Sequence, residues 1–139
     1  MNLSKFNTNR INLWISALRS GRYNQAYWHP FKNENTRSSL GVACEVYGRY
    51  GGTGSYHYVQ MLKNLTKQEG IVGCYLPEIF FLPERIMHWY GFDTTDPMLK
   101  VDESEDSCDK IERLISGCDL DLSFCEIASA IEETYLKNV

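Results

Sequence analysis

The strongest hydrophobic pattern lies near the start of the chain. Four apolar residues between positions 11 and 18 recur at the i, i+3, i+4, i+7 spacing that places side chains on one face of a helix. Asn7 or Thr8 can cap the beginning of this helix, and Gly21 can end it. The pattern predicts an amphipathic helix with Trp14 packed in the core.

Similar signals predict further helices. Ser38 or Ser39 can cap a second helix that ends before Gly48. Ser123 and Glu126 have the spacing of a capping box at the start of the last helix. The other segments with a helical pattern and a terminating glycine are 59–70, 83–90 and 109–117.

Two stretches have a different character. Residues 71–82 are rich in β-branched and aromatic side chains and are interrupted by Gly73 and Pro77, which favours two short strands or extended segments. Residues 93–106 are acidic and predict an exposed connection. The expected fold is a mostly helical α+β domain, with about five helices and a few short strands or extended segments in one compact unit over 1–139.

The composition is that of a globular protein, with 43% hydrophobic and 23% charged residues. The net charge of −4 is unevenly distributed along the chain. Residues 1–69 carry nine Lys or Arg and three Asp or Glu, whereas residues 70–139 carry five Lys or Arg and fifteen Asp or Glu. Either the two surfaces attract each other within the fold or between copies, or the basic half faces an anionic ligand. Duplex nucleic acid is not an expected partner, because the acidic half would repel its phosphates.

The sequence contains no signal for a membrane or for disulfides. The longest apolar run, at 79–82, is too short to span a bilayer, and the N-terminal residues lack the apolar core of a signal peptide. The five cysteines form no C-x-x-C pair, so free thiols are expected. We therefore expect a cytoplasmic protein without a membrane partner.

Signatures of catalysis are missing. The three histidines, His29, His57 and His88, have no metal-binding spacing. The glycines within 51–54 are not followed by the lysine of a triphosphatase loop. Cys44 with His29 or His57 stays open as a nucleophile. The chain is accordingly expected to hold no metal or cofactor and not to be an enzyme.

After catalytic and metal-binding signatures, the remaining candidate is a binding surface. The stretch YGRYGGTGSYHY at 47–58 offers glycine backbone groups that can approach an anion and aromatic faces that can stack on a base, although such residues also form ordinary mobile turns. With the arginines and aromatics that precede it, it supplies the groups that a phosphorylated, base-bearing small molecule requires. The predicted ligand-binding residues are Arg19, Arg22, Tyr23, Gln25, Trp28, Arg37, Arg49, Tyr50, Gly52, Tyr56 and His57.

Four segments, taken in order, carry a resemblance to a known family. WISALRSGRYNQ, SLGVACEVYG, LPERIMHWYGF and SFCEIASAIEE resemble small, mostly uncharacterised accessory proteins of bacteriophages and prophages. The family pattern runs W-x-x-A-L-R-S-G-x-Y-x-Q, C-C-L-G-V-x-C-x-x-Y, L-P-x-x-x-x-x-W-x-G and S-F-x-E-I-A-x-x-I-E. The resemblance extends from Trp14 to Glu133. The chain departs from the pattern at Ser38-Ser39, where two cysteines are usual, and at ISGCDLDLSF, where an L-N-D-x-G turn is usual.

The resemblance implies a function against host defence, since several unrelated small phage proteins sequester cyclic nucleotide or cyclic ADP-ribose signals. Sequestration requires tight binding and no reaction, which agrees with the missing catalytic signatures. The leading hypothesis is a phage-encoded sponge in the host cytoplasm that binds a small phosphorylated nucleotide as a homo-oligomer. Two alternatives stay open: an inhibitor or adaptor that docks on a host protein through the acidic half, and an enzyme that degrades a nucleotide signal.

Overall fold

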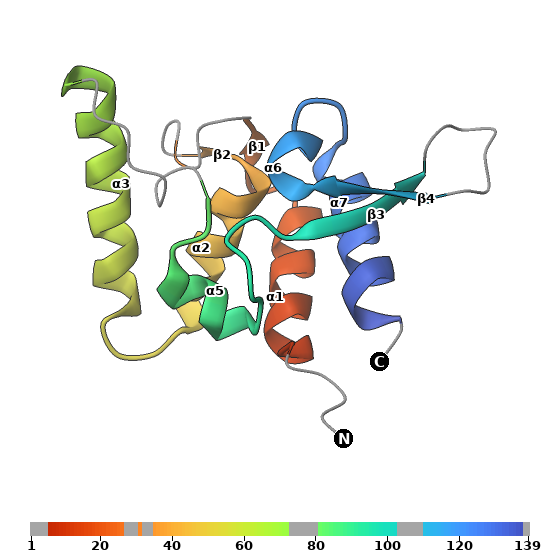
Figure 1. Ribbon diagram of the computed structural model, residues 1–139. Helices are drawn as coiled ribbons and strands as arrows, with labels where there is room; N and C mark the ends of the chain where they lie inside the picture. Colours follow the sequence, from red (N-terminus) through yellow and green to blue (C-terminus); the bar gives the residue numbers. More distant parts are fainter. Residues whose placement is uncertain (1–5, 27–30, 32–34, 73–80, 103–109, 138–139) are drawn as a thin grey trace.

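The computed structural model describes residues 6–26, 31, 35–72, 81–102 and 110–137, apart from the side chains of 66–72 and 102. These residues form one mostly helical α+β domain, as predicted (Figure 1). Its helices are α1 (Thr8–Arg19), α2 (Ser39–Tyr50), α3 (Ser55–Val72), α5 (Glu84–Tyr90), α6 (Ile115–Cys118) and α7 (Phe124–Ile131), and the π-helical turn η1 (Glu132–Leu136) continues α7. Its strands are β1 (Asn24–Gln25), β2 (Thr36–Arg37), β3 (Met98–Asp102) and β4 (Lys110–Leu114).

Helix α1 lies at the centre of the domain, between α2 and α7 (Figure 1). The apolar face predicted between positions 11 and 18 is buried and packs against both neighbours. The Asn7 side chain accepts a hydrogen bond from the backbone N–H of Arg10 and so caps the helix. Gly21 adopts a φ of 77°, a left-handed conformation that suits glycine, just past the end of the helix.

Two aromatic side chains connect α1 and α5 to the backbone of α2. The indole N–H of Trp14 donates to the Ser39 carbonyl at 3.0 Å, and the Tyr90 hydroxyl donates to the Ala43 carbonyl at 2.7 Å. The two buried rings also contact each other, with centroids 5.6 Å apart. Because a buried N–H or O–H needs a partner, these bonds fix the position of α2 against both helices.

A buried carboxylate joins the start of α2 to the segment after α6. Asp119 is only 6% exposed. It accepts hydrogen bonds from the backbone N–H of Ser39 at 3.1 Å, from the Ser39 hydroxyl at 2.8 Å and from the Gln25 amide at 2.9 Å. Ser39 is the first residue of α2, so the carboxylate lies at a helix N-terminus, where the helix dipole favours a negative charge.

The strands β3 and β4 form an antiparallel hairpin in which Met98 lies opposite Leu114. The other edge of β3 is covered by η1. The backbone N–H of Lys100 donates to the Thr134 hydroxyl at 2.9 Å, and the Tyr135 hydroxyl donates to the Met98 carbonyl at 2.6 Å. Side chains of η1 therefore hold the hairpin against the end of α7.

Two predictions for the second half of the chain are wrong. The segment 109–117, predicted as a helix, contains β4 and only the short helix α6. The stretch 93–106, predicted as an exposed connection, contains β3, whose Leu99 is fully buried; its residues 103–106 lie outside the described residues. In the sequence KIERL, the two apolar residues Ile111 and Leu114 are three positions apart, a spacing that is compatible with a helix. The segment forms a strand instead because it pairs with β3.

The glycine-rich stretch is more helical than its composition suggests. Helix α2 continues through Gly48 to Tyr50, and α3 begins five residues later at Ser55. Only Gly51–Gly54 forms the turn between the two helices. The stretch 47–58 is therefore the junction of two helices and not a long loop.

The described residues test two other expectations only in part. The strands predicted within 71–82 fall mainly on residues 73–80, outside the described residues, while 71 and 72 belong to α3. Among the described helices, none combines the length and the apolar composition needed to cross a bilayer.

We predict that Asp119→Ala lowers the free energy of unfolding by about 1–3 kcal/mol, because it leaves the buried N–H of Ser39 without an acceptor. Asp121→Ala is the matched control. Asp121 forms a bidentate pair with Arg113, with N–O distances of 2.9 and 3.0 Å, but its side chain is 60% exposed, so the cost should stay below about 1 kcal/mol. Urea unfolding of both variants tests this order, and equal losses would contradict it.

A second prediction concerns pH. Burial raises the pKa of Asp119 above its ordinary value, and the hydrogen bonds from Gln25 and Ser39 oppose this rise only in part. The folded state therefore holds the proton to a higher pH than the unfolded state does. Stability from this group is fully present below the ordinary carboxyl pKa of about 3.9 and falls as pH rises through the folded pKa.

Urea unfolding of wild type and Asp119→Asn across the acid range measures this effect. The free energy of wild type minus that of Asp119→Asn should decrease as pH rises. A difference that increases with pH would mean that the pKa of Asp119 is lowered in the fold.

Candidate functional site

Four of the predicted ligand-binding residues meet in one groove. This α1–α2 groove has a volume of about 170 Å³ and runs between the second half of α1, the residues that follow it and the second half of α2. It brings together Arg22, Tyr23, Arg49 and Tyr50. Its other lining residues are Leu13, Ser16, Ala17, Ser20, Glu45 and Val46.

Local structure explains how these four residues meet. Helix α1 ends at Arg19 with Ser20 as its C-cap, and the left-handed Gly21 turns the chain so that Arg22 and Tyr23 face the end of the groove. Because α2 extends past Gly48, Arg49 and Tyr50 stand in its last turn and face the groove from the other wall. Basic side chains at a helix C-terminus are also favoured by the helix dipole.

The groove is electrostatically positive although Glu45 lines it. The Glu45 carboxylate is paired with Arg37 at 3.0 Å and with Lys63 at 2.6 Å. Within the described part of the chain, the guanidinium groups of Arg22 and Arg49 have no ion-pair partner, and both residues are exposed. An anion in the groove would therefore meet two available guanidinium groups, which suit phosphate well.

Arg37 has a different environment from the one expected of a ligand-binding residue. It is 4% exposed, and its guanidinium lies 5.3 Å from the Phe31 ring centroid and 5.9 Å from that of Tyr23. Its side chain also donates to Glu45. Arg37 therefore neutralises Glu45 and supports the Tyr23 ring from behind the groove.

The other predicted residues that the structure describes do not line the groove. Gln25 donates to Asp119 and to the Leu122 carbonyl at 2.8 Å, a structural role. Arg19 contacts α7 and η1 through Ser129 and Glu132.

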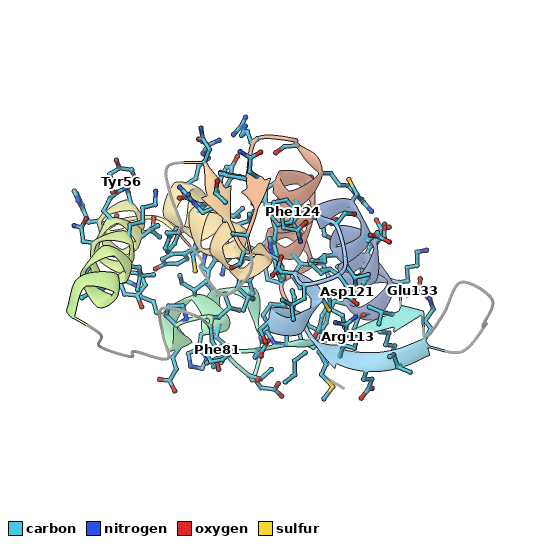
Figure 2. All side chains as sticks on the ribbon, turned by 90° about the horizontal axis from the view of Figure 1, so that it is seen from above. Tyr56, Phe81, Arg113, Asp121, Phe124 and Glu133 are labelled. Atoms are coloured by element: carbon cyan, nitrogen blue, oxygen red, sulfur yellow. The ribbon has the colours of Figure 1, made fainter. Side chains whose placement is uncertain are left out.

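The residues around the glycine turn are also elsewhere. Gly52 is an exposed turn residue with a φ of 97°. Tyr56 and His57 lie in the first turn of α3, and Figure 2 shows Tyr56 at the end of the molecule away from Glu133. Trp28 lies outside the described residues.

The described residues support neither the candidate cysteine nucleophile nor a metal site. Cys44 is buried, and burial, followed by the charge of Glu45, raises the pKa of its thiol, so that it stays protonated. Among the described residues, no group of three His, Cys, Asp or Glu could hold a metal ion. The arrangement can bind an anion and stack a ring, and it offers no activated nucleophile.

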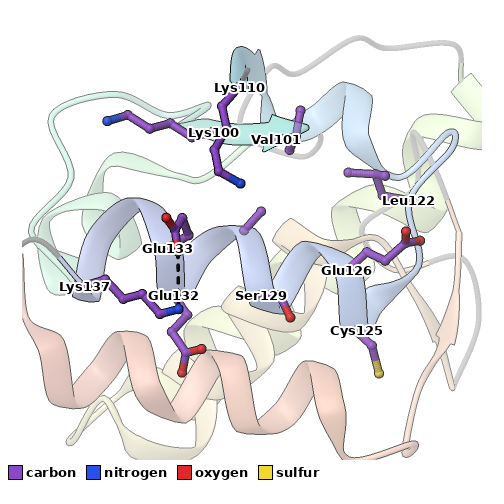
Figure 3. Close-up of a pocket in the computed structure, with 11 residues that line it drawn as sticks. Lys100, Val101, Lys110, Leu122, Cys125, Glu126, Ser129, Glu132, Glu133 and Lys137 are labelled. Atoms are coloured by element: carbon purple, nitrogen blue, oxygen red, sulfur yellow. Dashed lines mark ion pairs between the residues drawn. The ribbon is translucent and has the colours of Figure 1, made fainter. Parts of the chain in front are cut away.

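A larger pocket, which we name the hairpin cleft, lies between the β3–β4 hairpin and α7–η1 (Figure 3). Its volume is about 670 Å³. The residues that line it are Lys100, Val101, Lys110, Leu122, Cys125, Glu126, Ser129, Ala130, Glu132, Glu133 and Lys137. Sequence reasoning missed this pocket because it treated 93–106 as a connection and 109–117 as a helix, so that no hairpin wall was expected.

Comparison with known proteins assigns the chain to a family but gives no activity for it. The model of a family described as a domain of unknown function, DUF8296, matches residues 7–135. The chain belongs to the DUF8296 family. No curated protein and no solved structure matches this DUF8296 chain. Its function must therefore be argued from its own surface.

The groove geometry predicts opposite behaviour for two arginines of this DUF8296 protein. Arg37→Ala should lower the free energy of unfolding by roughly 2–3 kcal/mol, because it removes a buried partner of Glu45 while Lys63 remains. Arg49→Ala should leave stability nearly unchanged, since its side chain is exposed. Chemical denaturation compares the two, and a larger loss for Arg49→Ala would show that Arg49 has a structural role.

Proposed function

We propose that this DUF8296 protein binds a small phosphorylated, base-bearing ligand in the α1–α2 groove and sequesters it without cleavage. The resemblance to phage accessory proteins gives such binding a use, the removal of a nucleotide immune signal in the host cytoplasm. The fold alone does not imply this activity, and the proposal depends on the groove itself.

The observation that carries the proposal is the meeting of two arginines and two tyrosines that are distant in sequence. Arg22 and Tyr23 come from the segment after α1, while Arg49 and Tyr50 come from the end of α2. Guanidinium groups favour phosphate oxygens, and a tyrosine ring favours a base or a sugar face. Tyr50 is 53% exposed, so its ring is accessible to a ligand.

The size of the groove limits how the ligand can be held. A cavity of about 170 Å³ is smaller than the 300–1,000 Å³ of typical small-molecule sites. We infer that the groove holds the phosphate and part of one ring, while the remainder of the ligand extends over Tyr50. A second copy of the chain could cover that remainder, in agreement with the proposed homo-oligomer.

The first test incubates purified protein with cyclic dinucleotides, cyclic trinucleotides and cyclic ADP-ribose isomers and compares filtrates before and after heat denaturation. The expected result is a compound that is retained by the protein and returns intact on heating. A compound that returns altered would indicate an enzyme instead. If every compound passes through, the sequestration proposal fails, and a protein partner becomes the alternative.

Site variants then locate the binding. Arg22→Ala and Arg49→Ala should each weaken binding of the retained compound about tenfold or more, the effect of losing one charge-assisted interaction. The melting temperature of the free protein should be unchanged because both residues are exposed. Arg85→Ala removes an equal charge outside the groove and should bind like wild type. Loss of binding in Arg85→Ala alone would place the site elsewhere.

A further inference from the structure

We propose that the hairpin cleft is a second binding site, which accepts an organic anion with an apolar body. Among the residues that the structure describes, the cleft shares no lining residue with the α1–α2 groove. Its volume of about 670 Å³ falls within the range of small-molecule sites. The inference does not depend on the proposed sequestration of a nucleotide.

The apolar part of the ligand is indicated by three aliphatic residues of the cleft. Val101 comes from the inner face of β3, Ala130 from α7, and Leu122 from the segment before α7. Val101 and Ala130 are nearly buried, and Leu122 is partly exposed. An apolar ring or short chain placed here would contact Val101 and Ala130 and cover the exposed part of Leu122, which is favourable in proportion to the area covered.

The charge of the ligand is indicated by which groups in the cleft are already engaged. Each carboxylate of the helical wall has a partner: Glu126 accepts from the Ser123 N–H at 2.9 Å, Glu132 lies 3.7 Å from Arg19, and Glu133 lies 3.3 Å from Lys137. These acids are therefore poor sites for a ligand cation.

The hairpin wall is basic. Lys100 and Lys110 both line the cleft, and Figure 3 shows Lys110 reaching from the hairpin toward α7. Lys100 forms no ion pair with any residue in the described ranges. A carboxylate or sulfonate would therefore be attracted to the exposed ammonium group of Lys100 on this wall.

The walls of the cleft are held in place before any ligand binds. The bonds from the Lys100 N–H to Thr134 and from Tyr135 to the Met98 carbonyl fix the hairpin against η1. The π-helical turn also contributes Glu132 and Glu133 to the lining, and such turns are frequent at functional sites. A preformed site loses less entropy on binding.

The test uses anilinonaphthalene sulfonate, which combines an aromatic body with a sulfonate and fluoresces in an apolar site. In an Arg22→Ala/Arg49→Ala background, which removes the guanidinium groups of the α1–α2 groove, the protein should bind one molecule per chain in a saturable manner. The neutral N-phenylnaphthylamine should bind at least about tenfold more weakly, because it lacks the anion.

Lys100→Ala/Lys110→Ala should weaken sulfonate binding about tenfold, and Lys100→Glu/Lys110→Glu should weaken it further. Arg85→Ala, made in the same background, removes a charge outside both sites and is the control for sulfonate binding.

A second readout locates the probe. Cys44 and Cys118 are buried, whereas Cys125 is exposed and lines the cleft. In a Cys74→Ser/Cys108→Ser background, bound sulfonate should slow alkylation of Cys125 severalfold, and thermal melting should show that every variant is folded. Non-saturable binding, binding unchanged in Lys100→Glu/Lys110→Glu, or alkylation unaffected by the probe would each overturn the proposal.

Discussion

The hydrogen-bonded carboxylate of Asp119 is the interaction on which the arrangement of this domain most depends. It fixes the first residue of α2 through Ser39, and the Ser39 carbonyl in turn accepts from Trp14 on α1. Gln25 links the same carboxylate to β1. Three segments that are far apart in sequence thus share one buried polar centre, and its bonds are directional where apolar contacts are not.

The position of α2 determines the chemistry of the groove. If α2 shifted along α1, Arg49 and Tyr50 would no longer lie across from the residues that follow α1. Neutralisation of Glu45 by Arg37 and Lys63 has a comparable effect, because an unpaired carboxylate in that wall would repel an anion. Packing and ion pairing behind the groove thereby leave its arginines available to a ligand.

Sequence reasoning was most successful where the signal was local. The cap at Asn7, the capping box of Ser123 and Glu126, and the buried stripe of α1 were all predicted correctly. It failed for β4, since a strand of five residues is decided by its partner across the hairpin. For the same reason, four predicted residues could be found to meet in the groove only once the helices were placed, and the hairpin cleft could not be anticipated.

Because η1 covers one edge of β3, it also affects the solubility of the protein. An open strand edge can recruit strands from other molecules and begin a growing aggregate. Thr134 and Tyr135 occupy this edge, so the hairpin presents only β4 for such recruitment. The sequence of β4, KIERL, places Lys110, Glu112 and Arg113 there, and charged side chains disfavour stacking of like copies. The π-helical turn therefore also protects the domain against self-association through the β3–β4 hairpin.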